Sequence, residues 1–232
     1  MDQPDTLGRD LESLRAELLA DPYFKNVPSM QRSERKTAVI FHAKDDLPEV
    51  RYRVLKLLAG YAVSFYAVVR DKQRLLEQVL ARNQADEDYW YQENELYDDL
   101  VHQLFKSRFH RGDHFEICFG KRGKSDRTVA LQLALDPARR TYEQTWGVST
   151  HTRIRIRAST LRQSGGLQAV DYFLWALQRL YERGDDRFWE VVRPQAKLVY
   201  DMDDTRTAAH GVYYTTSRPL TSAARAKKQL GI

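Results

Sequence analysis

Residues 165–182 read GGLQAVDYFLWALQRLYE. The spacing of the apolar residues predicts a helix over residues 166–183 that ends at Gly184. A helical wheel assigns the apolar face to Leu167, Val170, Phe173, Leu174, Leu177, Leu180 and Tyr181. Asp171 falls at the border of that face, on the polar flank near the helix start. It is either an ordinary acid favoured by the helix dipole or a functional carboxylate.

Strands alternate with helices on both sides of this helix. The nearest strand, residues 152–157 (TRIRIR), alternates strictly between isoleucine and arginine. Further strands are predicted at residues 36–41, 61–70, 115–119 and 197–200, and further helices at residues 6–20, 48–59, 71–83, 95–108, 126–135 and 186–192. Asp136-Pro137 should kink or break the helix before it. The alternation predicts an α/β fold in which helices cover both faces of a central sheet.

The chain has 232 residues, of which 42% are hydrophobic, enough for a sizeable core. We expect one core domain over residues 36–204, preceded by a helix and connector (1–35) and followed by an irregular tail (205–232). The single cysteine, Cys118, excludes a disulfide within the chain. No signal peptide is visible, and the longest uncharged apolar run is too short for a membrane span, so we expect a soluble cytoplasmic protein.

Positive charge is concentrated in the middle of the chain. The net charge is +5, and residues 120–163 carry ten bases against three acids, whereas residues 86–99 carry seven acids and no base. Four cations lie in a predicted loop that would suit a phosphate: Lys121, Arg122, Lys124 and Arg127. Arg153, Arg155 and Arg157 share one strand face at intervals of about 7 Å, which suits a phosphodiester backbone. Alternatively, these arginines pair with the acids of residues 86–99.

Two polar residues follow predicted strands, where α/β folds place their sites. His42 comes after the strand at 36–41, and Asp71 ends the strand at 61–70. The structural alternatives are a histidine satisfied by neighbouring backbone and an aspartate that caps the next helix. The sequence contains no zinc pattern, no glycine-rich phosphate loop and no serine nucleophile elbow, so it supports none of those enzyme classes.

The run Gly165–Tyr172, followed by Leu174-Trp175-Ala176-Leu177 and Arg179, resembles the "GLQ-x-AD" helix of the domain-of-unknown-function family numbered 3800. Phe41-His42-Ala43 resembles the second landmark of that family, and the order of elements between the two is similar. The likeness covers roughly residues 36–204. It implies a ribonuclease H-like fold, with a mixed central sheet and helices on both faces, of a kind common in bacteria, phages and mobile elements.

The resemblance also implies a nuclease site with two divalent metals, Mg²⁺ or Mn²⁺. Asp171 would be a metal ligand, and His42 would position groups or transfer a proton. Two departures stand out: the family's first strand, ending in Asp-Glu-Ser, has no counterpart, and Gly120 stands where the central strand usually ends in an aspartate. Asp71 is one conceivable substitute ligand. The missing strand would leave a sheet edge open to the N-terminal segment, a protein partner or a second copy.

Two functions from different classes therefore stand side by side. The first is a metal-dependent nuclease, with Asp171 and His42 in the site and the basic loop and arginine strand gripping phosphates. The second is a catalytically depleted relative that binds nucleic acid or a partner protein. A purely structural subunit is the third. Nucleic-acid binding would separate the first two from the third, because phosphate contacts weaken steeply with added salt.

Overall fold

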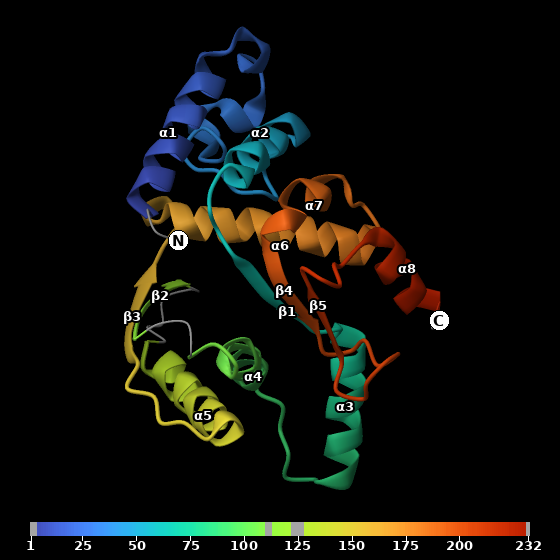
Figure 1. The fold of residues 1–232 in the computed structure, drawn as a ribbon. Helices are drawn as coiled ribbons and strands as arrows, with labels where there is room; N and C mark the ends of the chain where they lie inside the picture. Colours follow the sequence, from blue (N-terminus) through green and yellow to red (C-terminus); the bar gives the residue numbers. More distant parts are fainter. Residues whose placement is uncertain (1–3, 110–112, 122–127, 231–232) are drawn as a thin grey trace. The chain divides into compact units, whose positions relative to one another are not determined.

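The computed structural model describes residues 4–109, 113–121 and 128–230 of a mixed α/β protein (Figure 1). Its helices are α1 (Pro4–Ala20), α2 (Pro48–Ala59), α3 (Lys72–Ala85), α4 (Glu93–Phe105), α5 (Thr128–Trp146), α6 (Gly165–Arg183), α7 (Arg187–Val192) and α8 (Ser222–Leu230). Its strands are β1 (Phe65–Val69), β2 (His114–Gly120), β3 (Arg153–Ser159), β4 (Ala196–Asp201) and β5 (Val212–Thr215). Helices and strands thus alternate along much of the chain, as the sequence predicts.

The described strands form two sheets rather than the single central sheet that we expected. One is a mixed sheet of three strands in the order β1-β4-β5. The other pairs β2 with β3 in parallel, since Arg153 N donates to Asp113 O and Arg157 lies beside Glu116, so both strands advance together. The α/β class is confirmed.

The chain divides into two compact units. Unit 1 comprises residues 1–66, 159–198 and 214–232, and unit 2 comprises residues 67–158 and 199–213. Each unit therefore combines segments that are distant in sequence. None of the described helices is long and apolar enough to cross a membrane.

The core of unit 1 lies among α1, α2, α6 and α7. Its largest fully buried side chain is Trp189, whose indole N–H donates to Leu220 O at 3.0 Å. Phe65 stacks on Phe173 of α6 with ring centres 4.9 Å apart. Apolar side chains from α1 and α2 complete the core: Leu7, Leu11, Leu18, Val50, Val54, Leu55 and Leu58.

The buried face of helix α6 overlaps only in part with the one the wheel assigns. Its buried residues are Gln168, Ala169, Tyr172, Phe173, Ala176, Leu177 and Leu180. Val170 and Leu174, which we placed in the apolar face, are 45% and 48% exposed. Ala169 and Ala176 are buried although small, and the Tyr172 hydroxyl donates to the buried carboxylate of Asp46. A helical wheel based on hydropathy takes into account neither the small size of alanine nor the hydrogen bond of a tyrosine.

Two predicted elements of unit 1 are absent or shorter. Residues 36–41 form turns rather than a strand: Val39 N and Ile40 N both donate to Lys36 O. The strand predicted over 61–70 begins only at Phe65. In both segments local backbone bonds replace strand pairing, since Val63 N likewise donates to Tyr61 O. His42 consequently does not follow a strand.

Unit 2 packs α4 and α5 against one face of the β2-β3 sheet. Val101, Leu131, Ala134 and Leu135 are buried there, together with the inward side chains of Ile117, Ile154 and Ile156. Thus the alternation in TRIRIR behaves as predicted, with isoleucines inward and arginines outward. Helix α5 continues through Pro137, where we expected a break. Pro137 has no N–H to donate to the carbonyl of Leu133, four residues earlier. That carbonyl lies on an exposed side of α5, where water can donate to it instead.

The segment 205–232, expected to be irregular, contains β5 and α8. In unit 2, Tyr213 stacks on Tyr200 with ring centres 4.2 Å apart. In unit 1, the guanidinium of Arg225 donates to Tyr181 O at 2.6 and 3.0 Å. These contacts fix the tail in place. Local hydropathy cannot predict them, because they join the tail to other segments of the chain.

Candidate functional site

The segment between Thr37 and Asp46 is organised around one buried carboxylate. Asp46 is 1% exposed and accepts three hydrogen bonds: from the Thr37 hydroxyl at 2.5 Å, from the His42 backbone N–H at 2.9 Å, and from the Tyr172 hydroxyl. Burial raises the pKa of Asp46, although these bonds and Arg51 oppose the rise. Asp46 therefore ties the 37–46 segment to α6.

Asp171 is the second tie between the same two elements. Its Oδ2 accepts from Ala43 N at 2.8 Å, and its Oδ1 lies 3.9 Å from Nε2 of His42. Its side chain is 27% exposed. The structure thus brings together two residues, Asp171 and His42, that the sequence separates by more than a hundred positions.

His42 lies between two carboxylates. On one side is Asp171, and on the other Nδ1 is 3.4 Å from Oδ2 of Asp45. The imidazole is one third exposed, so a ligand can reach it. A histidine beside carboxylates can accept or release a proton, which is the chemistry of a general acid or base.

Arg51 holds the same segment from the opposite side. Its guanidinium donates to Ala43 O and, at 3.3 Å, to Lys44 O. It also lies 4.4 Å from the ring centre of Trp175, and Arg179 lies 5.0 Å from that ring. The backbone at Ala43 is therefore clamped through its N–H by Asp171 and through its carbonyl by Arg51. Asp171 consequently has a structural task, whatever its chemistry.

The described residues do not fit the two-metal site that the family resemblance implies. Oδ2 of Asp171 is engaged by Ala43 N–H, and all three donors around Asp46 are directed at its oxygens. Across residues 4–109, 113–121 and 128–230, no group of three His, Cys, Asp or Glu residues is arranged to hold a metal ion.

Asp71 lies in unit 2, where it caps α3. Its carboxylate accepts from Gln73 N at 2.8 Å and Arg74 N at 3.4 Å, which is the helix-capping alternative that the sequence left open. Its own N–H donates to Oδ2 of Asp203 at 2.6 Å. Arg70 pairs with the same carboxylate at 3.1 Å. Asp71 thus belongs to a structural network around Asp203.

Sequence reasoning missed the other acids of that network. Asp201, Asp203 and Asp204 are 0–3% exposed, and Arg206 binds Asp204 through two hydrogen bonds of 2.8 Å. The signal was present in the run DMDD directly after a predicted strand. Buried acids held by arginines and backbone N–H groups fix the turn after β4.

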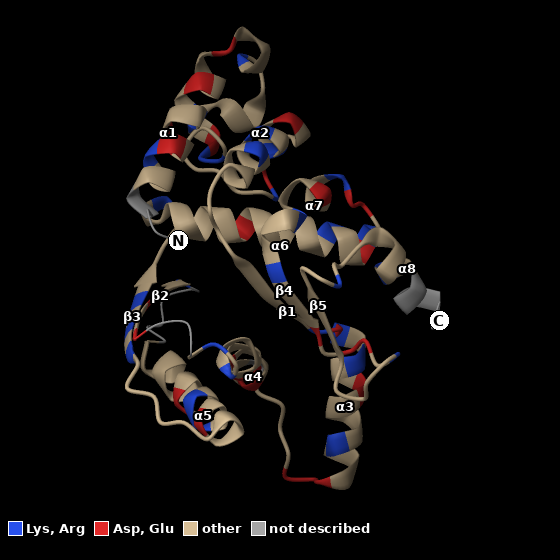
Figure 2. Ribbon diagram, viewed as in Figure 1, with Lys and Arg blue, Asp and Glu red and all other residues tan. Residues whose placement is uncertain are grey.

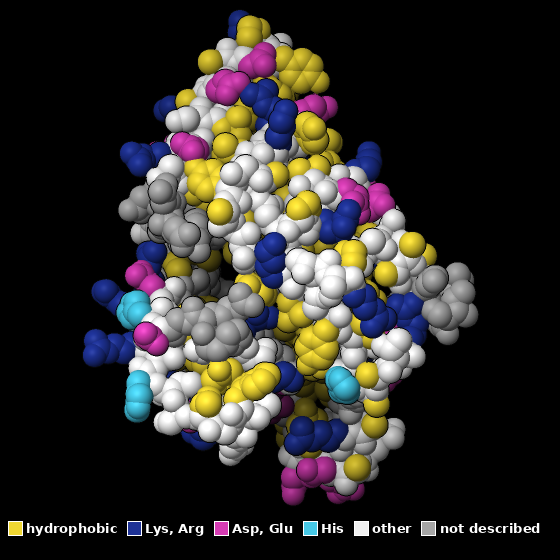
Figure 3. All heavy atoms as spheres, viewed as in Figure 1, with side chains coloured by type: hydrophobic (Ala, Val, Ile, Leu, Met, Phe, Trp, Pro, Cys, Tyr) yellow, Lys and Arg dark blue, Asp and Glu magenta, His cyan; other side chains and the backbone are white. Residues whose placement is uncertain are grey.

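The basic face of β3 in unit 2 is a feature that the sequence anticipated. Arg153, Arg155 and Arg157 are all exposed on the sheet face away from α4 and α5. Figure 2 marks basic positions along β3. Arg157 pairs with Glu116 of β2 at 2.9 Å, not with the acids of residues 86–99. Within the described part of the chain, the structure records no ion pair for Arg153 or Arg155. Figure 3 shows basic side chains projecting at the edge where β3 lies.

The expected phosphate loop can be followed only in part. Lys121 is exposed just after β2. Arg122, Lys124 and Arg127 lie outside the described residues. The basic surface of unit 2 therefore rests on β3 and Lys121.

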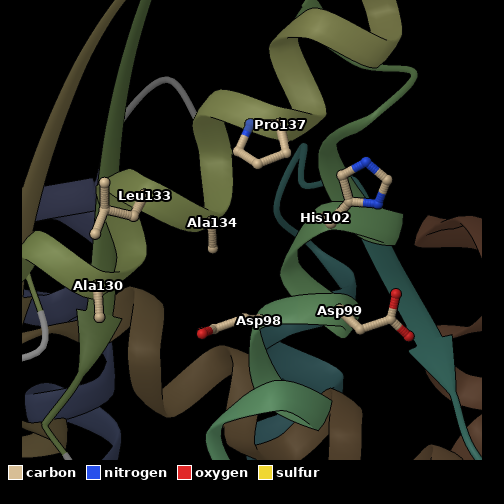
Figure 4. A pocket seen from close by; sticks show the side chains of 7 residues that line it. All are labelled: Asp98, Asp99, His102, Ala130, Leu133, Ala134 and Pro137. Atoms are coloured by element: carbon tan, nitrogen blue, oxygen red, sulfur yellow. The ribbon is translucent and has the colours of Figure 1, made fainter.

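Unit 2 also contains an open pocket of about 490 Å³ between α4 and α5. It is lined by Asp98, Asp99, His102, Ala130, Leu133, Ala134 and Pro137 (Figure 4). The two carboxylates leave α4 in opposite directions and so do not act as a pair. Nε2 of His102 is 3.1 Å from the Thr141 hydroxyl, and burial lowers the pKa of His102. A neutral, hydrogen-bonded histidine here is a packing residue.

Comparison with known proteins identifies no relative of this chain. The chain matches no family model, no curated protein and no solved structure.

Proposed function

We propose that the protein binds nucleic acid through its phosphates and that the exposed arginine face of β3 is the principal contact. The observation that carries this proposal is three arginines at alternate positions on a solvent-facing strand. Only Arg157 has a recorded acidic partner among the described residues, and that partner, Glu116, is itself half exposed. Such a row of cations stays available to an anionic polymer.

Strand geometry supports a polymer rather than a small anion. Side chains at alternate positions on one face repeat about every 7 Å, so the three guanidinium groups span about 14 Å. Each guanidinium can hold two oxygens of one phosphate, which favours successive phosphates along a chain. Backbone contacts of this kind give affinity without base specificity. We therefore expect binding that tolerates many sequences.

We also infer that the chain is related to the ribonuclease H-like proteins of bacteria, phages and mobile elements. The GLQ helix supports this kinship. So does the meeting of the FHA landmark with Asp171 of that helix, since the two contact one another through Ala43 and His42. The kinship would make nucleic acid the natural partner of the arginine face.

The test is a titration of fluorescent 20-nucleotide single-stranded RNA, single-stranded DNA and duplexes at several salt concentrations. The variant carries Arg153→Gln, Arg155→Gln and Arg157→Gln together. Each lost phosphate contact should make the slope of log affinity against log salt shallower by about 0.7 for single strands and about 0.9 for duplexes. The triple variant should thus lose about two units of slope on single strands and nearly three on duplexes, and bind at least about tenfold more weakly.

The matched control removes three exposed cations from unit 1. Arg32, Arg35 and Lys36 lie together in a surface turn, and their replacement by glutamine changes the net charge by the same amount. This control should keep most of the affinity and the slope. An equal loss in both triple variants would reduce the effect to net charge, and binding without salt dependence would refute phosphate recognition.

A second candidate, hydrolysis of phosphodiesters, is favoured by the contact of His42 with Asp171. His42 is one third exposed and lies beside a carboxylate, so it can move a proton at an attacking or leaving oxygen. We expect Asp171→Asn to lower cleavage of labelled RNA or DNA about 100-fold, because the asparagine oxygen can still accept from Ala43 N–H while the charge beside His42 is lost.

Cleavage should be measured with Mg²⁺, with Mn²⁺ and with a chelator, and Glu34→Gln, at an exposed acid of unit 1 outside the site, serves as the control. Loss of activity in Asp171→Asn with an unchanged melting temperature would support a catalytic role. No cleavage by the wild type under any of the three conditions would leave binding as the function.

A further inference from the structure

Unit 1 contains a surface groove that neither proposed function uses. It has a volume of about 600 Å³ and lies between residues 21–24, the start of α2 and the start of α7. Phe24 and Phe188 form its buried floor, 5% and 9% exposed. Tyr23 and Tyr52 line it and are 69% and 51% exposed. Two exposed tyrosines above a phenylalanine floor form an aromatic groove of ligand-binding size.

Local structure explains why both tyrosines point outward. Asp21 caps the short turn that follows it by accepting from Tyr23 N at 2.9 Å, and the adjacent Phe24 turns inward to pack in the core. On α2 the buried residues are Val50, Val54, Leu55 and Leu58, and Tyr52 lies on the opposite side of the helix. Hence neither ring contributes to the core, and their exposure is built into the fold.

The charges around the groove decide between two kinds of aromatic-binding ligand. Arg53 is held by Glu17, and Arg187 is held by Asp185 through two bonds of 2.8 Å. Asp21 and Glu49 also line the groove, and the described structure records no cation paired with either. The lining thus has two acids and two arginines, but both arginines are already paired with acids outside the lining, Glu17 and Asp185, which leaves Asp21 and Glu49 to set the local charge. A phosphate-bearing strand would be repelled, whereas a ligand with a basic residue would be attracted.

We propose that this groove binds a proline-rich peptide segment flanked by a basic residue. A polyproline II chain has three residues per turn and no internal hydrogen bonds, so its prolines repeat on one face about every 9 Å and its carbonyls stay free. Proline rings pack on the faces of Tyr23 and Tyr52, the tyrosine hydroxyls donate to peptide carbonyls, and the basic flank meets Glu49 and Asp21. The stiff chain loses little entropy on docking.

The test uses the full-length protein and a fluorescein-labelled peptide of two proline triplets flanked by arginines. Two control peptides replace the prolines by glycines or the arginines by glutamates. We expect saturable micromolar binding to the first peptide, about tenfold weaker binding to the acidic one and none to the glycine one. A 10-nucleotide single-stranded RNA serves as the competing class of ligand.

Tyr52→Ala and Tyr23→Ala should each weaken peptide binding about tenfold or more, because exposed aromatic residues are the usual energetic centres of such grooves. Neither ring is buried, so both variants should fold. Trp90→Ala is the control, since Trp90 is 78% exposed in unit 2 and should not affect binding. The proposal is overturned by absence of saturation, by equal binding of the glycine peptide, by variants that bind as the wild type does, or by RNA that displaces the peptide from the tyrosines.

Discussion

Replacing Asp46 by alanine should destabilise the folded protein by about 3–5 kcal/mol, because buried donors would lose their acceptor. Three donors converge on this 1%-exposed carboxylate: the Thr37 hydroxyl, His42 N–H and the Tyr172 hydroxyl. Water cannot reach these groups freely, and the 37–46 segment would lose the bonds that fold it. The measurement is the free energy of unfolding from urea denaturation followed by far-UV circular dichroism.

Two variants separate this explanation from simple loss of charge. Asp46→Asn should cost about 1 kcal/mol or less, since the amide oxygen can accept from His42 N–H and Tyr172 while its NH₂ donates to the Thr37 hydroxyl. Asp45→Ala, next in sequence and 41% exposed, should change stability by less than about 0.5 kcal/mol. If Asp46→Ala costs no more than Asp45→Ala, the carboxylate does not organise the segment.

The pH dependence of stability gives the same site a second readout. Burial raises the folded-state pKa of Asp46 above its ordinary value of 3.8, so the folded protein binds this proton more tightly than the unfolded chain does. The stability from this group is therefore complete below pH 3.8 and is lost as the pH rises through the folded-state pKa. Relative to Asp46→Asn, the wild type should lose stability as the pH rises. An unchanged or rising difference would contradict the raised pKa.

Periodicity predicted the elements whose burial follows local pattern. The ends of α6, the isoleucine face of β3 and the capping role open to Asp71 all follow from spacing or from a neighbouring N–H. The prediction of a strand at residues 36–41 was wrong. There the Thr37 hydroxyl donates a hydrogen bond to Asp46, and the segment has no partner strand among the described residues. Hydropathy describes each side chain alone, whereas this segment folds through bonds between side chains.

In the candidate site, too, local sequence pattern predicts some features, whereas others depend on contacts between distant residues. Spacing alone could not place His42 near Asp171, and the family resemblance named both without giving their contact. The buried acids after β4 and the tyrosine groove escaped notice because each depends on segments distant in sequence. Sequence patterns do not predict which polar groups from distant segments come into contact in the folded protein.

Gly211→Ala should destabilise the protein by about 3 kcal/mol or more, since this position combines backbone strain with a collision. Gly211 has φ +99°, a conformation that side-chain-bearing residues rarely adopt. An added Cβ would overlap the carbonyl oxygen of Asp201 and lie 2.8 Å from Cα of Met202. Those atoms belong to the turn that the buried acids and Arg70 hold in place, so they cannot move aside cheaply. Thermal and urea unfolding measure the loss.

Gly147→Ala is the matched control, because Gly147 also has a positive φ, +62°, but a Cβ there would meet nothing within 4 Å. It should cost only the conformational strain, about 1 kcal/mol. The difference between the two variants then isolates the collision with Asp201 and Met202. Equal costs would mean that the turn after β4 yields readily, and the buried network of Asp201, Asp203 and Asp204 would then be a flexible rather than a rigid support.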